Sequence, residues 1–320
     1  MMFYRKSMIG VLLLMFLAVG IGGCAGNSEP EAQSSSTWPE KEIHFIWHSK
    51  AGSSGDILLR NLGSTIEQNL GKPVVVENRE GAGGYNAWDY LRKAAPDGYT
   101  FGGIAPTFLT SMLINKMDLT PADYEPVAVL FIDPLIIYCR ADGWENFDDF
   151  VAYVKEHPGE VKIAGGTPGN IDFMVIRDLR EKAGLDIKEV PFEGGGEAPV
   201  AVVGKHLDIG IGEYGEIGPM VESGKLKILA SFNPVPGTDI KTIQDYGYNI
   251  KVEKFRAIVA PKDTPREIID QMYQAIVGAF QDENFIKYYE TSKMVPYLKG
   301  PEEAKIIIDA QYEQIKAAVE

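Results

Sequence analysis

Small and polar residues separate an apolar strand from an amphipathic helix at Ser49–Gly55. The run Ile43–His48 predicts the strand. Apolar residues at helical spacing from Ile57 to Ile66 predict the helix, with Asp56 as its N-cap. The first N–H groups of a helix lack internal partners and carry partial positive charge, so this junction can bind an anion. An ordinary strand-to-helix turn would use the same residue types. The candidate ligand-binding residues here are Lys50, Ala51, Gly52, Ser53, Ser54 and Asp56.

The same arrangement recurs later in the chain. Lys162–Ala164 predicts a strand and Ile171–Ala183 a helix, and the candidates in the small-residue loop between them are Thr167, Pro168, Gly169 and Asn170. Four further candidates follow other predicted strands, namely Pro106, Thr107, Phe192 and Tyr214. Either aromatic side chain would serve equally well in a core. Because ligands of open parallel sheets lie beyond the carboxyl ends of the strands, we expect these loops to meet at one cleft.

Catalytic, metal and cofactor interpretations fit the residues poorly. Ser53 or Ser54 with His48 as base would suggest a hydrolase, but the G-x-S-x-G elbow is missing and no acid is placed to orient the imidazole. His44 and His48 lack a third zinc ligand nearby. The glycines of Gly81–Gly84 do not continue into a dinucleotide fingerprint. We therefore expect a binding protein with no catalysis, no metal and no cofactor.

The overall charge restricts the partners. The chain has 320 residues, a formal net charge of −14 and 45% hydrophobic residues. Such acidity argues against nucleic acid or an anionic membrane surface as the main partner, whereas the hydrophobic fraction suits a globular protein. Cys139 lies in an apolar run and Cys24 is the only other cysteine, so we expect no disulfide framework.

The first 37 residues are typical of targeting and tether segments. Arg5 and Lys6 precede a short apolar stretch, Ile9–Ile21, and two glycines before Cys24 complete a lipoprotein-type cleavage box. We expect a signal peptide at residues 1–23, lipidation of Cys24 and a flexible polar tether at residues 24–37. The protein would then lie outside the cytoplasm, attached to the cell membrane by the lipid alone.

Alternating strands and helices predict an α/β protein with two domains. Strand-like runs surround Asp133–Pro134, and a strand at Phe255–Ala260 crosses back to the first half. We expect domain 1 at residues 38–138 plus 253–320 and domain 2 at residues 139–252. Two such units joined by two crossings would enclose a cleft.

Spaced motifs across Trp38–Glu320 resemble one family of receptors. They are Trp38–Ile43, Ala51–Asp56, Gly71–Arg79 with Gly81–Gly84, Ala95–Thr100, Val190–Phe192, Gly194–Gly195, Asp208, Ala260–Pro261 and Thr264–Pro265. At these residues the chain is similar to the extracytoplasmic substrate-binding receptors of tripartite tricarboxylate transporters, also called the Bug family.

The resemblance implies a two-domain clamshell, a periplasmic-binding-protein-like (type II) fold with the ligand cleft between its domains. In that family two loops hold a ligand carboxylate through backbone N–H groups and small polar side chains, and they correspond here to Ala51–Asp56 and Thr167–Asn170. The implied partners are a small organic acid and the membrane subunits of an ion-driven transporter, and the receptor is expected to be a monomer. The alternative is a receptor that feeds a membrane signalling protein.

Several positions depart from the family pattern. His48–Lys50 replaces aromatic and proline residues, and Phe173, Glu193 and Phe255 replace a histidine, a lysine and a tryptophan. Arg256 follows the last of these. Lys50 would either meet a second ligand carboxylate or be an ordinary surface lysine. The acidic residues Glu193, Glu213 and Glu216 allow a cation-bearing ligand such as an amino acid.

Overall fold

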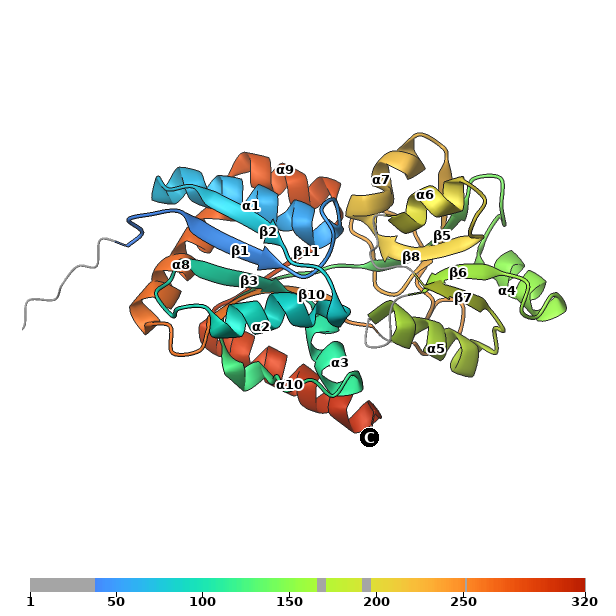
Figure 1. Cartoon of the computed structure of the whole chain (residues 1–320). Helices are drawn as coiled ribbons and strands as arrows, with labels where there is room; N and C mark the ends of the chain where they lie inside the picture. Colours follow the sequence, from blue (N-terminus) through green and yellow to red (C-terminus); the bar gives the residue numbers. More distant parts are fainter. Residues whose placement is uncertain (1–37, 166–170, 192–196, 251, 320) are drawn as a thin grey trace, which may run out of the picture. The chain divides into compact units, whose positions relative to one another are not determined.

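The computed structural model describes residues 38–165, 171–191, 197–250 and 252–319, which form two β-sheets flanked by helices (Figure 1). We call the six-stranded sheet with its helices the first lobe, and the five-stranded sheet with its helices the second lobe. The expected signal peptide, the tether and several candidate residues lie outside the described residues, namely Cys24, Thr167, Pro168, Gly169, Asn170 and Phe192.

The first sheet has the strand order β11-β4-β10-β3-β1-β2. Its strands are β1 (Ile43–Trp47), β2 (Val74–Asn78), β3 (Thr100–Ile104), β4 (Tyr124–Ile132), β10 (Phe255–Pro261) and β11 (Val295–Lys299). Strand β1 runs parallel to β2 and β3, whereas β10 is antiparallel to β3 and β4 and β11 is antiparallel to β4. The helices of this lobe are α1 (Ser54–Leu70), α2 (Tyr85–Lys93), α3 (Pro106–Ile114), α8 (Arg266–Ala279), α9 (Glu283–Thr291) and α10 (Pro301–Val319).

Alternation along the strands divides the core of the first lobe into two layers. Phe45 and Trp47 pack with α1, α8 and α9, whereas Ile46 packs with α2, α3 and α10. Successive side chains of a strand point to opposite faces, so a sheet covered on both faces needs apolar residues at every position. This double burial fixes β1, and with it the loop that leads from Trp47 into α1.

The second sheet has the strand order β7-β6-β8-β5-β9. Its strands are β5 (Leu135–Arg140), β6 (Lys162–Gly165), β7 (Lys188–Pro191), β8 (Ile209–Glu213) and β9 (Leu226–Ser231). Strand β6 is parallel to β7 and β8, and β5 is antiparallel to β8 and β9. The helices of this lobe are α4 (Phe147–Glu156), α5 (Ile171–Ala183), α6 (Ala198–Val203) and α7 (Tyr214–Glu222). Helices α4 and α5 cover one face, and α6 and α7 the other.

The chain changes sheet at Asp133–Pro134, between β4 and β5, and returns between β9 and β10. The first change comes before the boundary that we expected at residue 138, because Leu135–Arg140 pairs with β8 and β9. Pro134 suits this position, since proline has no N–H to offer to a β-ladder.

Three local expectations were wrong. Helix α1 begins at Ser54 with Ser53 as N-cap, so Asp56 is the third helical residue rather than the cap. Helices α3 and α7 were not expected at all. Helix α3 is apolar on all sides and shows no helical period, while α7 contains Pro219 and two glycines and is typical of a loop. None of the helices in the described part of the chain has the length and apolar character needed to cross a membrane.

Candidate ligand-binding site

A cavity of about 130 Å³ lies between the two lobes. The first lobe lines it with residues after β1, β2 and β3, and the second lobe with the end of β8 and the first turns of α5 and α7. Lys254 and Arg256 reach it from the segment that returns to the first sheet. A water molecule needs about 10–15 Å³ of such space, so the cavity suits a molecule of about ten non-hydrogen atoms.

The two serines at the start of α1 have different partners. Ser53 Oγ accepts a hydrogen bond from Trp47 Nε1 at 3.0 Å and makes no cap bond to the helix. Ser54 Oγ donates to Glu213 Oε2 at 3.1 Å and accepts from the Arg256 guanidinium. The backbone N–H of Ser54 donates to Glu216 Oε1 at 2.8 Å. The start of α1 therefore holds a carboxylate oxygen, as helix N-termini commonly do.

Four charged groups lie buried beside this helix start. Arg256 Nη2 lies 2.7 Å from Asp133 Oδ2 and 3.5 Å from Glu213 Oε1. Lys254 forms an ion pair with Glu213, and burial together with the Arg256 charge lowers the pKa of Lys254 to about 8. Arg256, Asp133 and Glu213 are each at most 3% exposed. Two cations and two carboxylates thus compensate one another, which buried charges require.

Glu216 adds a third carboxylate, from the first turn of α7. Its Oε1 accepts the Ser54 N–H, while its Oε2 is buried and has no hydrogen-bond partner among the described residues. Burial raises the pKa of Glu216 to about 7, although the Ser54 bond and the Arg256 charge act to lower it. The Glu216 carboxylate therefore lines the cavity while being poorly solvated, and its Oε2 can still accept a hydrogen bond.

His48 lines the cavity between two indole rings. The centroid of its ring lies 4.4 Å from that of Trp47 and 5.1 Å from that of Trp88. Burial, with the Arg256 and Lys254 charges, lowers the pKa of His48 to about 3, so the imidazole is neutral at physiological pH. In the described structure it makes no hydrogen bond to either serine, and the Ser54 hydroxyl bonds instead to Glu213. This geometry is that of a binding site rather than of a nucleophile and its base.

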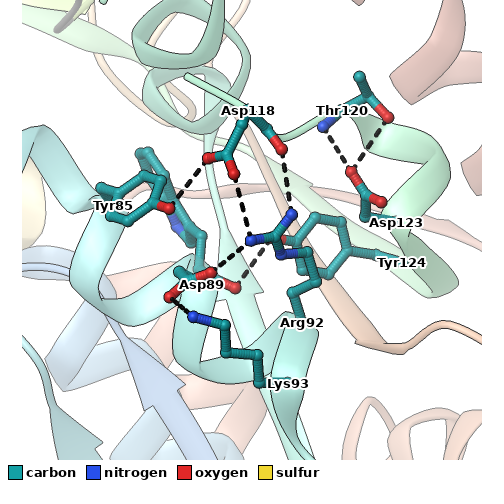
Figure 2. Close-up of polar contacts among 9 residues, drawn as sticks. Tyr85, Asp89, Arg92, Lys93, Asp118, Thr120, Asp123 and Tyr124 are labelled. Carbon is teal, nitrogen blue, oxygen red and sulfur yellow. Dashed lines mark hydrogen bonds and ion pairs between the residues drawn. The ribbon is translucent and has the colours of Figure 1, made fainter.

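The loop Gly81–Gly84 also lines the cavity and leads into α2, which polar contacts hold in place (Figure 2). Within α2, Arg92 Nη2 lies 2.6 Å from Asp89 Oδ1. Tyr85 Oη donates to Asp118 Oδ1 at 2.9 Å, and Arg92 Nη1 donates to the Asp118 carbonyl at 3.1 Å (Figure 2). These contacts tie α2 to the segment before β4 and so help to fix the loop at the cavity.

Three of the candidate ligand residues, Ser53, Ser54 and Thr107, line the cavity. Among the other candidates that the structure describes, those that do not line it are Lys50, Ala51, Gly52, Asp56, Pro106 and Tyr214.

Among the candidates that do not line the cavity, Gly52, Asp56 and Lys50 make contacts elsewhere. Asp56 accepts the Gly52 N–H at 2.8 Å and lies 2.9 Å from Arg60, so it braces the loop from behind. Although burial raises the pKa of Asp56, its hydrogen bonds to Arg60 and Gly52 outweigh that effect and lower it. Lys50 Nζ lies 2.7 Å from Glu197 Oε1 in the second lobe, and Tyr214 is the first residue of α7.

Sequence reasoning missed most of the charged lining. His48, Asp172, Glu213, Glu216, Lys254 and Arg256 all line the cavity, and none was among the named ligand-binding candidates. The sequence did single out Glu213 and Glu216 for a cation-bearing ligand, and His48 and Arg256 as departures from the family pattern, but not Asp172 or Lys254. Arg256 carried a signal, because it is a charge inside the apolar strand β10. The sequence signal for Glu216 was weaker, because Glu216 lies on α7, a helix that was not expected. Among the described residues, no group of acidic, histidine or cysteine side chains could hold a metal ion.

Known proteins share this sequence pattern and fold. The family described as "Tripartite tricarboxylate transporter family receptor" matches residues 58–320. Protein BugT of Bordetella pertussis is 27% identical over 281 residues, which cover 85% of this chain and 86% of BugT. The periplasmic binding protein BugD has a similar structure, with a TM-score of 0.82 and 25% identity over 88% of this chain and 97% of that chain. MatC from Rhodopseudomonas palustris, solved with bound malate, shares the fold at a TM-score of 0.78 and 22% identity, covering 88% of this chain and 100% of that chain.

The family match covers most of the chain, from the first turns of α1 to the end of α10. The fold agrees with it, since two α/β lobes enclose a cavity as in a two-domain clamshell receptor. Members of the family are substrate-binding receptors rather than enzymes. The chain belongs to the receptor family of the tripartite tricarboxylate transporters.

Proposed function

We propose that this protein is an extracytoplasmic receptor that binds a small organic acid between its lobes and delivers it to the membrane subunits of a tripartite tricarboxylate-type transporter. The observation that carries the proposal is that the N-terminus of α1 already binds a carboxylate oxygen inside the cavity. The Ser54 N–H donates to Glu216 Oε1 at 2.8 Å. Arg256 adds a buried positive charge at the same place. Charge-assisted hydrogen bonds of this kind contribute about 1.5–3 kcal/mol each.

The proposed contacts come from both lobes. Ser53, Ser54 and Thr107 line the cavity on the first lobe. The hydroxyls of Ser53 and Thr107 would donate to the acid, while Ser54 holds Glu213 and Glu216 beside it. The loop Thr167–Asn170 and Phe192 remain predictions for the second lobe. The family membership and the malate bound by MatC support a carboxylate as the ligand.

Membrane attachment through Cys24 is a separate part of the proposal. A Cys24→Ser variant is expected to move from the membrane fraction to the soluble fraction and to lose incorporation of labelled palmitate. Cys139→Ser is the matched control, because Cys139 is fully buried in the second lobe. If the Cys24→Ser variant stayed in the membrane fraction with its label, the lipid anchor would be wrong.

A thermal-shift screen tests the ligand class. The purified protein is heated with mono-, di- and tricarboxylic acids, with amino acids and with the amide of each acid. A ligand at 100 times its Kd stabilises the folded state by about 2.7 kcal/mol. We expect at least one acid to raise the Tm by several degrees while its amide does not. If only acid-free solutes raised the Tm, an organic acid would not be the ligand.

A further inference from the structure

The lining of the cavity carries more negative than positive charge. Its carboxylates away from solvent are Asp172, Glu213 and Glu216, with Glu80 exposed at its edge, and its cations are Lys254 and Arg256. Arg256 is further compensated by Asp133, 2.7 Å away. The lowered pKa of His48 keeps that side chain neutral. A ligand with two or three carboxylates would add negative charge to a buried site that already has an excess of it, and like charges in such surroundings repel strongly.

Glu216 shows where a positive charge would be received. Its Oε1 is engaged by the Ser54 N–H, whereas its Oε2 is buried at the cavity without a hydrogen-bond partner among the described residues. A buried carboxylate oxygen without a donor is costly, so a donor from the ligand would be stabilising. A ligand carboxylate that took over the Ser54 N–H would instead have to displace Glu216 and leave it unpaired.

The Arg256 guanidinium lines the same cavity and can bind the carboxylate of a ligand there. Its Nε and Nη2 donate to Asp133 Oδ2, and its Nη2 also contacts the Ser54 hydroxyl. These bonds use Nε and Nη2 and not the third nitrogen, Nη1. The cavity volume of about 130 Å³ leaves space for a compact molecule that spans Arg256 and Glu216, both of which line it.

We propose that the ligand carries a protonated amine in addition to its carboxylate, with the amine received by Glu216 and the carboxylate by Arg256. The inference rests on the proposed function, since it specifies the class of acid that this site takes. An amino acid or another aminated acid fits, because one positive group offsets part of the surplus negative charge and supplies the donor that Glu216 Oε2 lacks.

Matched pairs of compounds test the inference by calorimetry and thermal shift. Each pair is an amine-free acid and its aminated counterpart: succinate and aspartate, glutarate and glutamate, pentanoate and norvaline, hexanoate and 6-aminohexanoate. The other proteinogenic amino acids and putrescine, an amine without an acid, complete the panel. We expect an aminated acid to bind at least tenfold more tightly than its amine-free partner.

Variants of α7 locate the amine. Glu216→Gln is expected to weaken binding of the aminated acid at least tenfold. The advantage of the aminated acid, which is the ratio of its affinity to that of the amine-free partner, should fall as well. Glu216→Asp keeps the charge and should retain part of that advantage. Glu222→Gln removes one negative charge from the exposed end of the same helix and should change neither affinity. Circular dichroism and the unfolding midpoint confirm that each variant folds.

The outcomes separate the two proposals. If amine-free acids bound as well as or better than their aminated partners, this inference would be wrong while the organic-acid receptor would stand. If putrescine alone stabilised the protein, both proposals would fail. If no aminated acid raised the Tm or gave heat of binding, this inference would also be overturned.

Discussion

The Ser54 N–H donates to Glu216 Oε1 at 2.8 Å, and this bond joins the first turns of α1 and α7, which belong to different lobes. Both partners lie at helix N-termini, where partial positive charge favours a carboxylate. Further polar contacts link the lobes, among them those from Ser54 Oγ to Glu213 at 3.1 Å, from Arg256 to Glu213 at 3.5 Å and from Lys50 to Glu197 at 2.7 Å. Contacts between the lobes and the proposed ligand contacts therefore use the same few residues.

Replacing Arg256 tests the buried ion pair. Arg256→Met leaves the Asp133 carboxylate, which is fully buried, without its cation. Breaking a buried pair from one side costs about 3–5 kcal/mol, because a charge remains uncompensated. We expect the free energy of unfolding, measured by urea denaturation, to fall by that amount.

The double variant Asp133→Asn with Arg256→Met is the control for the single Arg256→Met variant, and the two form part of a double-mutant cycle. It removes both charges and should recover most of the stability lost by Arg256→Met alone. A single variant as stable as the parent protein would show that Asp133 gains little from Arg256.

Gly55 sets the position of the first loop. A Cβ added to Gly55 would lie 2.0 Å from Cζ2 of Trp47, whose indole N–H binds Ser53. Gly55→Ala must therefore displace the buried ring and the Ser53 side chain. We expect a loss of about 1–3 kcal/mol of stability, typical of overpacking, together with weaker ligand binding. Urea denaturation and calorimetry measure the two effects.

Gly215→Ala is the matched control, since Gly215 is likewise the second residue of a helix that begins at the cavity. A Cβ there would lie 3.6 Å from Ser292, which is ordinary contact. Its stability should stay within about 0.5 kcal/mol of the parent protein or rise slightly, as alanine favours helix. Equal losses in both variants would contradict the role assigned to Gly55.

Local patterns were enough to predict the α/β architecture and the junction at Ser53 and Ser54. Apolar runs of strand length and loops rich in small residues report on their own neighbourhood. The ion cluster could not be predicted in this way, because Arg256 and Asp133 lie 123 positions apart and Ser54 and Glu216 lie 162 apart. Pairing at such distances follows from the strand order of the sheets, which no local period encodes.

The expectation for Asp56 failed for a related reason. The sequence indicated a polar residue at the start of a helix, but Ser53 and Asp56 both fit that description. The structure resolves the choice, since Asp56 bonds back to the Gly52 N–H while Ser53 occupies the cap position. The same backbone bond explains why Asp56 does not face the cavity.

His48 makes stability depend on pH. Its pKa is about 3 in the folded protein, against 6.5 for an ordinary histidine. A lowered folded-state pKa means that its contribution is complete above pH 6.5 and is lost as the pH falls towards 3. At pH 5 the loss is about 2 kcal/mol, at 1.36 kcal/mol per pH unit. Urea midpoints at pH 7 and pH 5 measure it.

The His48→Gln variant should lose less stability than the parent protein between these two pH values, by about that amount. His157→Gln controls for an ordinary surface histidine, since the His157 side chain is 42% exposed and lies 3.5 Å from Glu160. If His48→Gln kept the full pH dependence of the parent protein, the neutral buried imidazole would be excluded as its source.

Glu216 should make ligand affinity rise with pH. Burial raises its pKa to about 7, and Arg256, Asp172 and Asp133 are the charged groups that act on it. The proposed amine binds only the ionised carboxylate, so the bound proton must leave first. Between pH 6 and pH 8 the ionised fraction grows about tenfold, and affinity for an aminated acid should grow with it. Above pH 8 the gain from Glu216 should stop, because nearly all of its carboxylate is then ionised.

Calorimetry in two buffers of different ionisation enthalpy measures the proton that binding releases near pH 6. The Glu216→Gln variant has no carboxylate at this position to titrate, so its affinity should be nearly constant over the same range. Glu222→Gln should keep the slope of the parent protein, because that residue is exposed at the far end of α7. A slope that survived in Glu216→Gln would assign the titration to another group and would remove the pH argument for an amine at Glu216.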